Sequence, residues 1–188
     1  MHIVLINFKI RHICVFSIKK LMKSKRNIVF LGMMGSGKTS IGKLISNKLK
    51  RDFFDIDQVI EDNVGMNISK IFNQKGEKFF RHQEEKITLN ILKKNDKIIA
   101  LGGGAFLNKN IRDEILNNHI SFWLNWDAKT LINRIKKSAK RPIAINSTSN
   151  ELNKLIQKRS YIYSKALYKV ECDGLTKVEI VKEVLKKI

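Results

Sequence analysis

A glycine-rich segment from Gly32 to Thr39 has the residue types and spacing of a phosphate-binding loop. It fits the pattern G-x-x-x-x-G-K-[ST], in which glycines let successive backbone N–H groups point at phosphate oxygens. In such a loop Lys38 meets the outer phosphates and the Thr39 hydroxyl meets Mg²⁺. The apolar run Ile28 to Leu31 precedes it, and apolar residues at helical spacing follow. This strand, loop and helix context disfavours the alternative, a glycine-rich turn that happens to precede a lysine.

Two carboxylates, Asp55 and Asp57, end the next short apolar run. At a spacing of two they lie on the same side of an extended chain, so we expect one site to use both. Asp55 could hold a water of Mg²⁺, and Asp57 could accept a hydrogen bond from a substrate hydroxyl and take up its proton. The alternative for one of the pair is the N-cap of the following helix.

Arg81 and Glu84 form a candidate anion clamp in an expected helix. Glu84 falls on the apolar stripe of Phe80 and Ile87, so its charge needs a partner there. Arg81 is three residues away, close enough for the carboxylate to orient its guanidinium. An ordinary surface ion pair is the alternative.

A run of three glycines, Gly102 to Gly104, directly follows the apolar run Ile98 to Leu101. Such a run serves either a sharp turn or the close approach of backbone to a ligand. Arg159 lies within the apolar stripe of another expected helix, and a buried arginine requires a counter-charge. A bound carboxylate would supply it, and Asp57 or Glu84 are the alternatives within the protein.

Basic residues gather between Arg134 and Pro142, a segment with little apolar content that includes Arg141. This composition suits a mobile lid that brings an arginine onto a transferring phosphate. A solvated basic loop is the alternative.

From Asn27 onward, strand-like and helix-like segments alternate, which predicts an α/β fold with a largely parallel sheet. The expected strands are Ile28–Leu31, Phe53–Asp55, Ile98–Leu101, Ile120–Leu124 and Lys169–Glu171. The expected helices are 38–50, 57–64, 68–75, 77–94, 109–117, 128–136, 150–166 and 176–187. Ligands in such sheets bind beyond the carboxyl ends of the strands, where the glycine-rich and aspartate-rich segments fall.

The chain has 188 residues and is 43% hydrophobic, enough for one domain with a buried core. Its net charge of +20 is spread over scattered lysines, and no nucleic-acid-binding motif accompanies it. Cys14 and Cys172 have no companions at metal-ligand spacing, so we expect neither a disulfide framework nor a zinc site, as in a reduced cytoplasm.

Residues 1–26 stand apart as an N-terminal extension, which we expect to be dispensable, and 27–188 form the expected catalytic domain. Charged residues interrupt the apolar runs of the extension, so it resembles neither a signal peptide nor a membrane span. Met22 lies just before the first strand, consistent with a functional start there.

Taken together, these segments closely resemble the shikimate kinase family over about 27 to 188. The matching features, in order, are the phosphate loop with Gly42 after it, Asp55-Ile56-Asp57, Gly76-Glu77 to Phe80-Arg81-x-x-Glu84, Gly102-Gly103-Gly104, Arg141-Pro142, and Arg159 four residues before Tyr163. The resemblance implies a three-layer α/β sandwich with a five-stranded parallel sheet, a P-loop fold of the nucleoside-monophosphate-kinase type with a mobile lid. It also implies ATP-dependent phosphorylation of the shikimate 3-hydroxyl.

The resemblance implies these roles, each stated as an expectation. Shikimate would be held by Asp57, Arg81, Gly103, Gly104 and Arg159. ATP would be held by Gly35, Ser36, Gly37, Lys38, Thr39, Ser40, Arg134 and Arg141. Mg²⁺ would rest on Thr39 and, through water, Asp55, while Lys38, Asp57 and Arg141 would act in catalysis. A cytoplasmic monomer without nucleic-acid or membrane partners is expected.

Departures from the family pattern are small, such as Ile143 after Arg141-Pro142 where leucine is common. Two rival classes remain. A gluconate or nucleoside-monophosphate kinase would share the loop and lid, but would not call for Arg81 and Arg159 beside Asp57. A GTP-driven switch would need Asn-Lys-x-Asp, and the segment 108–111 lacks the aspartate.

Overall fold

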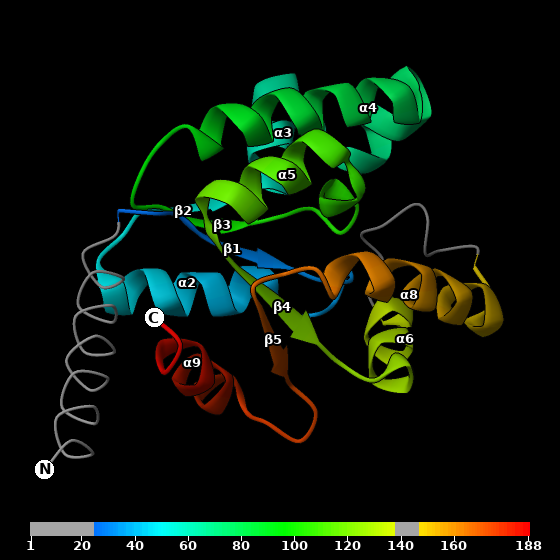
Figure 1. The fold of residues 1–188 in the computed structure, drawn as a ribbon. Coiled ribbons are helices and arrows are strands. Elements are labelled where there is room, and N and C mark those ends of the chain that lie inside the picture. The colour runs from blue at the N-terminus through cyan, green and yellow to red at the C-terminus, as the bar shows by residue number, and fades with distance from the viewer. Residues whose placement is uncertain (1–24, 138–146) are drawn as a thin grey trace, which may run out of the picture.

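A sheet of five parallel strands in the order β2-β3-β1-β4-β5 forms the centre of the molecule (Figure 1). The computed structural model describes residues 25–137 and 147–188. The strands are β1 (Ile28–Leu31), β2 (Phe53–Asp55), β3 (Ile98–Ala100), β4 (Ile120–Asn125) and β5 (Tyr168–Glu171). The expected parallel α/β sheet is confirmed, and β1 and β2 have the predicted bounds.

Helices cover both faces of this sheet. They are α2 (Lys38–Leu49), α3 (Ile56–Val64), α4 (Ile68–Leu92), α5 (Lys109–Asn118), α6 (Ala128–Lys136), α8 (Ser149–Tyr163) and α9 (Lys177–Leu185), with a 3₁₀ turn, η1 (Ala105–Leu107). In Figure 1, α3, α4 and α5 lie on one side of the sheet, and α2 and α9 lie on the other. The expected three-layer sandwich is therefore confirmed.

The core follows from this layering, because a parallel sheet covered on both faces is built from nearly continuous apolar strands. Every residue of β1 is buried, and the rings of Phe30 and Phe122 on neighbouring strands stack 5.7 Å apart. The central strand thus lies fully in the core, and the loop that follows it starts from a rigid position.

The two helices expected at 68–75 and 77–94 are joined in α4, but the break between them is real. Gly76 has φ 79° and ψ 168°, outside helical geometry, so the chain kinks there. A left-handed φ is open to glycine without a Cβ clash. The other helix ends lie within three residues of the predicted ones. Of the expected extension, residues 1–24 lie outside the described residues.

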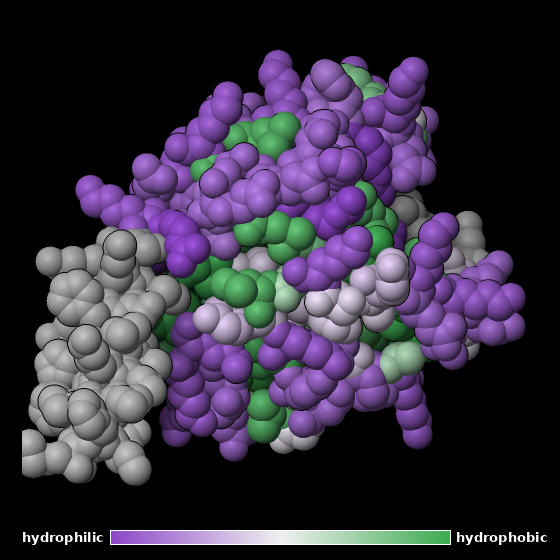
Figure 2. All heavy atoms as spheres, in the orientation of Figure 1, coloured by the Kyte–Doolittle hydropathy of each residue, from purple (hydrophilic) through white to green (hydrophobic). Residues whose placement is uncertain are grey.

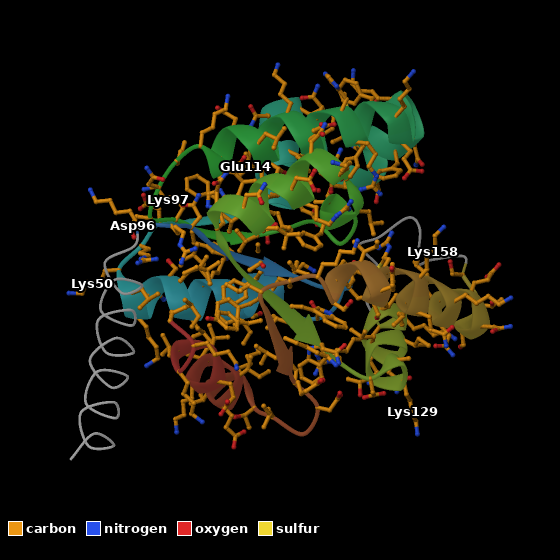
Figure 3. The ribbon with its side chains drawn as sticks, in the orientation of Figure 1. Lys50, Asp96, Lys97, Glu114, Lys129 and Lys158 are labelled. Atoms are coloured by element: carbon orange, nitrogen blue, oxygen red, sulfur yellow. The ribbon has the colours of Figure 1, made fainter. Side chains whose placement is uncertain are left out.

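Hydrophilic side chains cover most of the face seen in Figure 2, with small apolar areas between them. The labelled lysines project from separate parts of the fold in Figure 3: Lys50 and Lys97 at one end, Lys129 and Lys158 at the other. These four lysines are therefore not gathered in one place. Within 25–137 and 147–188, none of the helices is both long and apolar enough to cross a bilayer.

Candidate active site

Three neighbouring strands deliver their polar segments to one edge of the sheet. The loop from Gly32 follows β1, Asp55 ends β2, and the glycines from Gly102 follow β3, and these strands are adjacent in the order β2-β3-β1. The carboxyl ends of parallel strands share an edge, which is where ligands of such sheets bind. The predicted site segments are therefore brought together.

The phosphate loop is closed by Lys38, whose side chain folds back over it. Lys38 Nζ donates to the carbonyl oxygens of Gly32 and Met33, each at 2.9 Å, and the side chain is buried. Gly37 takes φ 89°, a left-handed conformation, at the N-cap of α2. Gly35, Ser36 and Ser40 lie in the same loop and first turn, as the expected phosphate cradle requires. The Lys38 ammonium is thus held at the N-terminus of α2, a position that favours the binding of anions.

Thr39 and Asp55 present oxygen atoms that suit Mg²⁺. Thr39 Oγ1 donates to Asp55 Oδ2 at 2.6 Å, while Asp55 Oδ1 accepts from the backbone N–H of Asp57 at 3.1 Å. Hard divalent cations prefer oxygen ligands, and Mg²⁺ usually keeps waters and phosphate oxygens in its shell. In the described part of the chain no three His, Cys, Asp or Glu side chains gather as a metal site. A Mg²⁺ here would therefore rest on this oxygen pair together with phosphate and water.

Asp57 lies in the first turn of α3, so the expectation that Asp55 and Asp57 share one side of an extended chain is wrong. The strand ends at Asp55, which caps the helix as the alternative reading allowed. Asp57 nevertheless faces the glycine turn. A Cβ on Gly102 would lie 2.7 Å from Asp57 Oδ1 and 2.6 Å from Glu84 Oε1. A larger residue at this position would displace these carboxylates.

The expected pair of Arg81 and Glu84 forms, and Glu77 joins it. Arg81 Nη1 lies 2.6 Å from Glu84 Oε2, and Arg81 Nε and Nη2 each donate to Glu77 Oε1 at 3.2 Å. A Cβ on Gly104 would lie 2.6 Å from Arg81 Nη1. The guanidinium is therefore held by carboxylates one turn before and one turn after it on the same face of α4, and it lies against the glycine turn.

Burial sets the electrostatics of this pair. It raises the pKa of the Glu84 carboxyl, an effect that the charge of Arg81 opposes. For Arg81, burial lowers the pKa, but the contacts with Glu84 and Glu77 outweigh it, and the pKa is raised. Glu84 is 3% exposed and Arg81 is half-buried, so this is a partly buried ion pair rather than the ordinary surface pair considered as its alternative.

Arg159 on α8 is a buried guanidinium, 6% exposed, at the other side of the glycine turn. Its Nη1 donates to the carbonyl oxygen of Gly103 at 3.1 Å. Among the described residues, its Nε has no hydrogen-bond partner, and its charge has only a minor effect on the pKa of Glu84, which burial and Arg81 dominate. A buried, unsatisfied donor on a cation is costly. The arrangement favours the remaining expectation, a bound anion.

Arg134 stacks on a residue that the sequence did not single out. Its guanidinium carbon lies 3.7 Å from the ring centroid of Trp126, and its Nη1 lies 3.4 Å from the Gly35 carbonyl oxygen. Trp126 Nε1 in turn donates to the Ser36 carbonyl oxygen at 2.9 Å. The expected neighbourhood of Arg134 and the phosphate loop is therefore found.

The expected lid is only partly within the described residues. Arg134 and Lys136 belong to α6. Arg141, with Pro142 beside it, lies outside the described residues, so its expected part in catalysis and ATP binding stays a prediction.

The family model and the similar curated proteins agree on one family. A family model for shikimate kinase matches residues 34–188. A shikimate kinase of Bacillus subtilis (strain 168) is 43% identical over 162 residues, which cover 83% of this chain and 85% of that protein. A shikimate kinase of Thermodesulfovibrio yellowstonii is 37% identical over 162 residues, covering 86% of this chain and 94% of that protein.

Among solved structures, a shikimate kinase from Acinetobacter baumannii, in complex with shikimate, has a TM-score of 0.81 to this chain. The two are 27% identical, and the match covers 86% of this chain and 92% of that one. The residues matched by the family model include all the site residues from Gly35 to Arg159.

Proposed function

The chain belongs to the shikimate kinase family, and we propose that Asp57, Arg81 and Arg159 form the site at which ATP phosphorylates the 3-hydroxyl of shikimate. The family's reaction transfers a phosphoryl group from ATP, with Mg²⁺, in aromatic biosynthesis. What we assign here is the part that each residue plays in it.

One observation carries the assignment of the acceptor site. Arg159 brings a buried positive charge with an unpartnered Nε to one side of the glycine turn. Arg81 lies against the same turn at Gly104. A planar carboxylate matches the donor geometry of guanidinium groups, so two arginines at one turn suit the carboxylate of shikimate. The backbone at Gly103 and Gly104 then lies under the ring.

Asp57 is assigned to the reacting hydroxyl. Its Oδ1 faces the turn at Gly102, beside the arginines, and it comes from the first turn of α3 next to Asp55. In this position it accepts a hydrogen bond from the 3-hydroxyl and keeps that oxygen directed at the γ-phosphorus. It takes the hydroxyl proton as the oxygen bonds to the γ-phosphorus and the bond from that phosphorus to the leaving ADP oxygen breaks.

The nucleotide side uses the phosphate loop. Lys38 and the loop N–H groups of Gly35 to Ser40 hold the phosphates, and Arg134 lies beside them on α6. Thr39 and Asp55 would hold Mg²⁺, which when bound neutralises charge on the outer phosphates. Arg141 is assigned to the transferring phosphoryl group on the family resemblance.

We also propose that the protein is a cytoplasmic monomer with residues 27–188 as its catalytic domain. The buried, free thiol of Cys172 suits a reducing compartment. The lysines are scattered along the sequence rather than collected in one block. Light scattering of the purified protein would test the monomer.

A coupled ADP-release assay tests the proposed acceptor. Shikimate, gluconate and CMP are offered separately, at equal concentrations and saturating MgATP. We expect ADP release well above the no-acceptor rate with shikimate only. A higher rate with gluconate or CMP would assign the acceptor site to one of the rival kinases.

A further inference from the structure

The carbonyl oxygen of Gly103 accepts hydrogen bonds from two side chains of the same helix. Arg159 Nη1 donates to it at 3.1 Å, and the hydroxyl of Tyr163 donates to it as well. The two donors are four residues apart on α8, the spacing that places side chains side by side on a helix. Tyr163 is 1% exposed and so reaches neither solvent nor the open site.

The same two donors contact the phosphate loop. Met33 Sδ lies 3.8 Å from Arg159 Nη1 and 3.9 Å from the Tyr163 hydroxyl oxygen. The ring of Trp123, on the strand beside β1, lies 6.1 Å from the ring of Tyr163. Tyr163 therefore sits where α8, the glycine turn and the phosphate loop meet, with its ring fixed by packing.

We infer that Tyr163 is a positioning residue for the acceptor site. Its hydroxyl fixes the Gly103 carbonyl, and that carbonyl sets where the Arg159 guanidinium stands and how its free Nε is aimed. Tyr163 acts through these groups and does not touch the substrate. The inference rests on the proposed assignment of Arg159 to the substrate carboxylate.

This geometry predicts a selective effect of removing one hydroxyl. Tyr163→Phe keeps the ring and its packing, and Arg159 still donates to the Gly103 carbonyl. We expect the KM for shikimate to rise roughly 3- to 10-fold, the range of one net hydrogen bond. The KM for ATP and kcat should stay within about twofold, because the arginine holds the acceptor and not the phosphates.

Tyr161→Phe is the matched control, since Tyr161 lies on the same helix but is 72% exposed. It should leave all three kinetic constants unchanged. Thermal unfolding of both variants accompanies the kinetics and reports any loss of folding. The KM for ATP, measured on the same samples, reports any distortion of the nucleotide side.

A double-mutant cycle with Arg159→Lys shows whether Tyr163 acts through Arg159. The readout is kcat/KM for shikimate, which stays measurable when KM is high. We expect the effect of Tyr163→Phe to shrink by at least half in the Arg159→Lys background. An equal effect in both backgrounds, or an equal rise of KM for shikimate and ATP, would overturn the inference.

A failure of the proposed function can be distinguished from a failure of this inference alone. If Arg159→Lys leaves the KM for shikimate unchanged, the carboxylate assignment falls and the inference falls with it. If Arg159→Lys raises that KM while Tyr163→Phe behaves like Tyr161→Phe, the assignment stands and only the inference is wrong.

Discussion

Thr39 and Asp55, sixteen residues apart in the chain, are joined by a hydrogen bond of 2.6 Å from Thr39 Oγ1 to Asp55 Oδ2. Thr39 is the last residue of the phosphate-loop segment, and Asp55 ends β2, two strands away from β1 in the sheet. The bond therefore links the nucleotide side of the site to the acceptor side. Asp55 also caps α3 through its other carboxylate oxygen. A single side chain thus orients the proposed Mg²⁺ position and the helix that carries Asp57.

Asp55→Asn should raise the Mg²⁺ concentration needed for half-maximal activity by roughly 10-fold or more. The amide oxygen can still accept from the Asp57 N–H, so the cap of α3 survives while the negative charge is lost. A Mg²⁺ titration at saturating shikimate measures the effect. Asp62→Asn, at an exposed position of the same helix, is the control and should not differ from the unmodified protein. An unchanged Mg²⁺ requirement would remove Asp55 from the metal site.

Lys38→Ala should lower kcat by roughly 10²- to 10³-fold while the fold is retained, because Lys38 acts on charge that develops at the phosphates. Turnover at saturating substrates and a circular dichroism spectrum check both parts. Lys43→Ala, at an exposed position of α2, should keep full turnover. Near-normal turnover of Lys38→Ala would exclude the proposed role.

The burial of His119 predicts that the folded protein loses stability at mildly acidic pH. Its side chain is buried, with Nε2 3.5 Å from Glu114 Oε1, and burial lowers its pKa below the ordinary value of 6.5, opposed by Glu114 and assisted by the charge of Arg26. The unfolded chain therefore binds this proton at a higher pH than the folded chain does. Stability should fall as pH drops below about 6.5, until the folded histidine is protonated too.

The measurement is urea unfolding between pH 8 and pH 5.5. His119→Gln should show a shallower loss of unfolding free energy over this range than the unmodified protein. His82→Gln, at an exposed position of α4, should follow the unmodified curve. Parallel curves for all three proteins would mean that His119 does not contribute. The raised pKa of Glu84 acts in the opposite direction, and it cancels in these differences because every variant keeps it.

A chain that begins at Met22 should unfold and turn over like the full one, because every assigned site residue lies downstream of it. Thermal unfolding and the ADP-release rate, measured side by side on both chains, give the answer. A large loss of melting temperature or of turnover in the shorter chain would show that the extension takes part in the fold or the site.

The sequence was sufficient where local pattern determines structure. The apolar run at 28–31 and the phosphate loop after it predicted β1, the loop and α2, because a buried parallel strand and an amphipathic helix each have their own periodicity. The pairing of Arg81 with Glu84 was also predictable, since one helical turn separates them.

Contacts between distant segments could not be predicted in this way. Trp126 bonds the carbonyl of Ser36 ninety residues away, and Tyr163 bonds that of Gly103 sixty residues away. No spacing in the sequence marks such pairs, which follow from strand order and helix packing. The error at Asp57 is different in kind. The end of β2 at Asp55 was predicted, but the chain turns into α3 directly after it, so Asp57 lies on a helix and not on an extended chain.

The central claim is that Arg81 and Arg159 bind the shikimate carboxylate while Asp57 serves the reacting hydroxyl. Arg81→Lys keeps the charge but loses the bidentate geometry, so it should chiefly raise the KM for shikimate, by roughly 10-fold. Asp57→Asn keeps the size and removes the proton acceptor, so it should chiefly lower kcat, by roughly 10²- to 10⁴-fold. The loss in kcat is smaller if the transition state of phosphoryl transfer is loose, because removal of the hydroxyl proton then contributes little to the rate and Asp57 mainly positions the hydroxyl.

The most direct test is therefore kcat and KM for shikimate, at saturating MgATP, in these two variants. Arg51→Lys, at an arginine paired 2.7 Å from Asp96 in the loops that precede β2 and β3, and Asp62→Asn are the matched controls. The account predicts that KM changes in Arg81→Lys, that kcat changes in Asp57→Asn, and that neither changes in the controls. An unchanged KM for shikimate in Arg81→Lys would contradict the role given to Arg81. An unchanged kcat in Asp57→Asn would contradict the role given to Asp57.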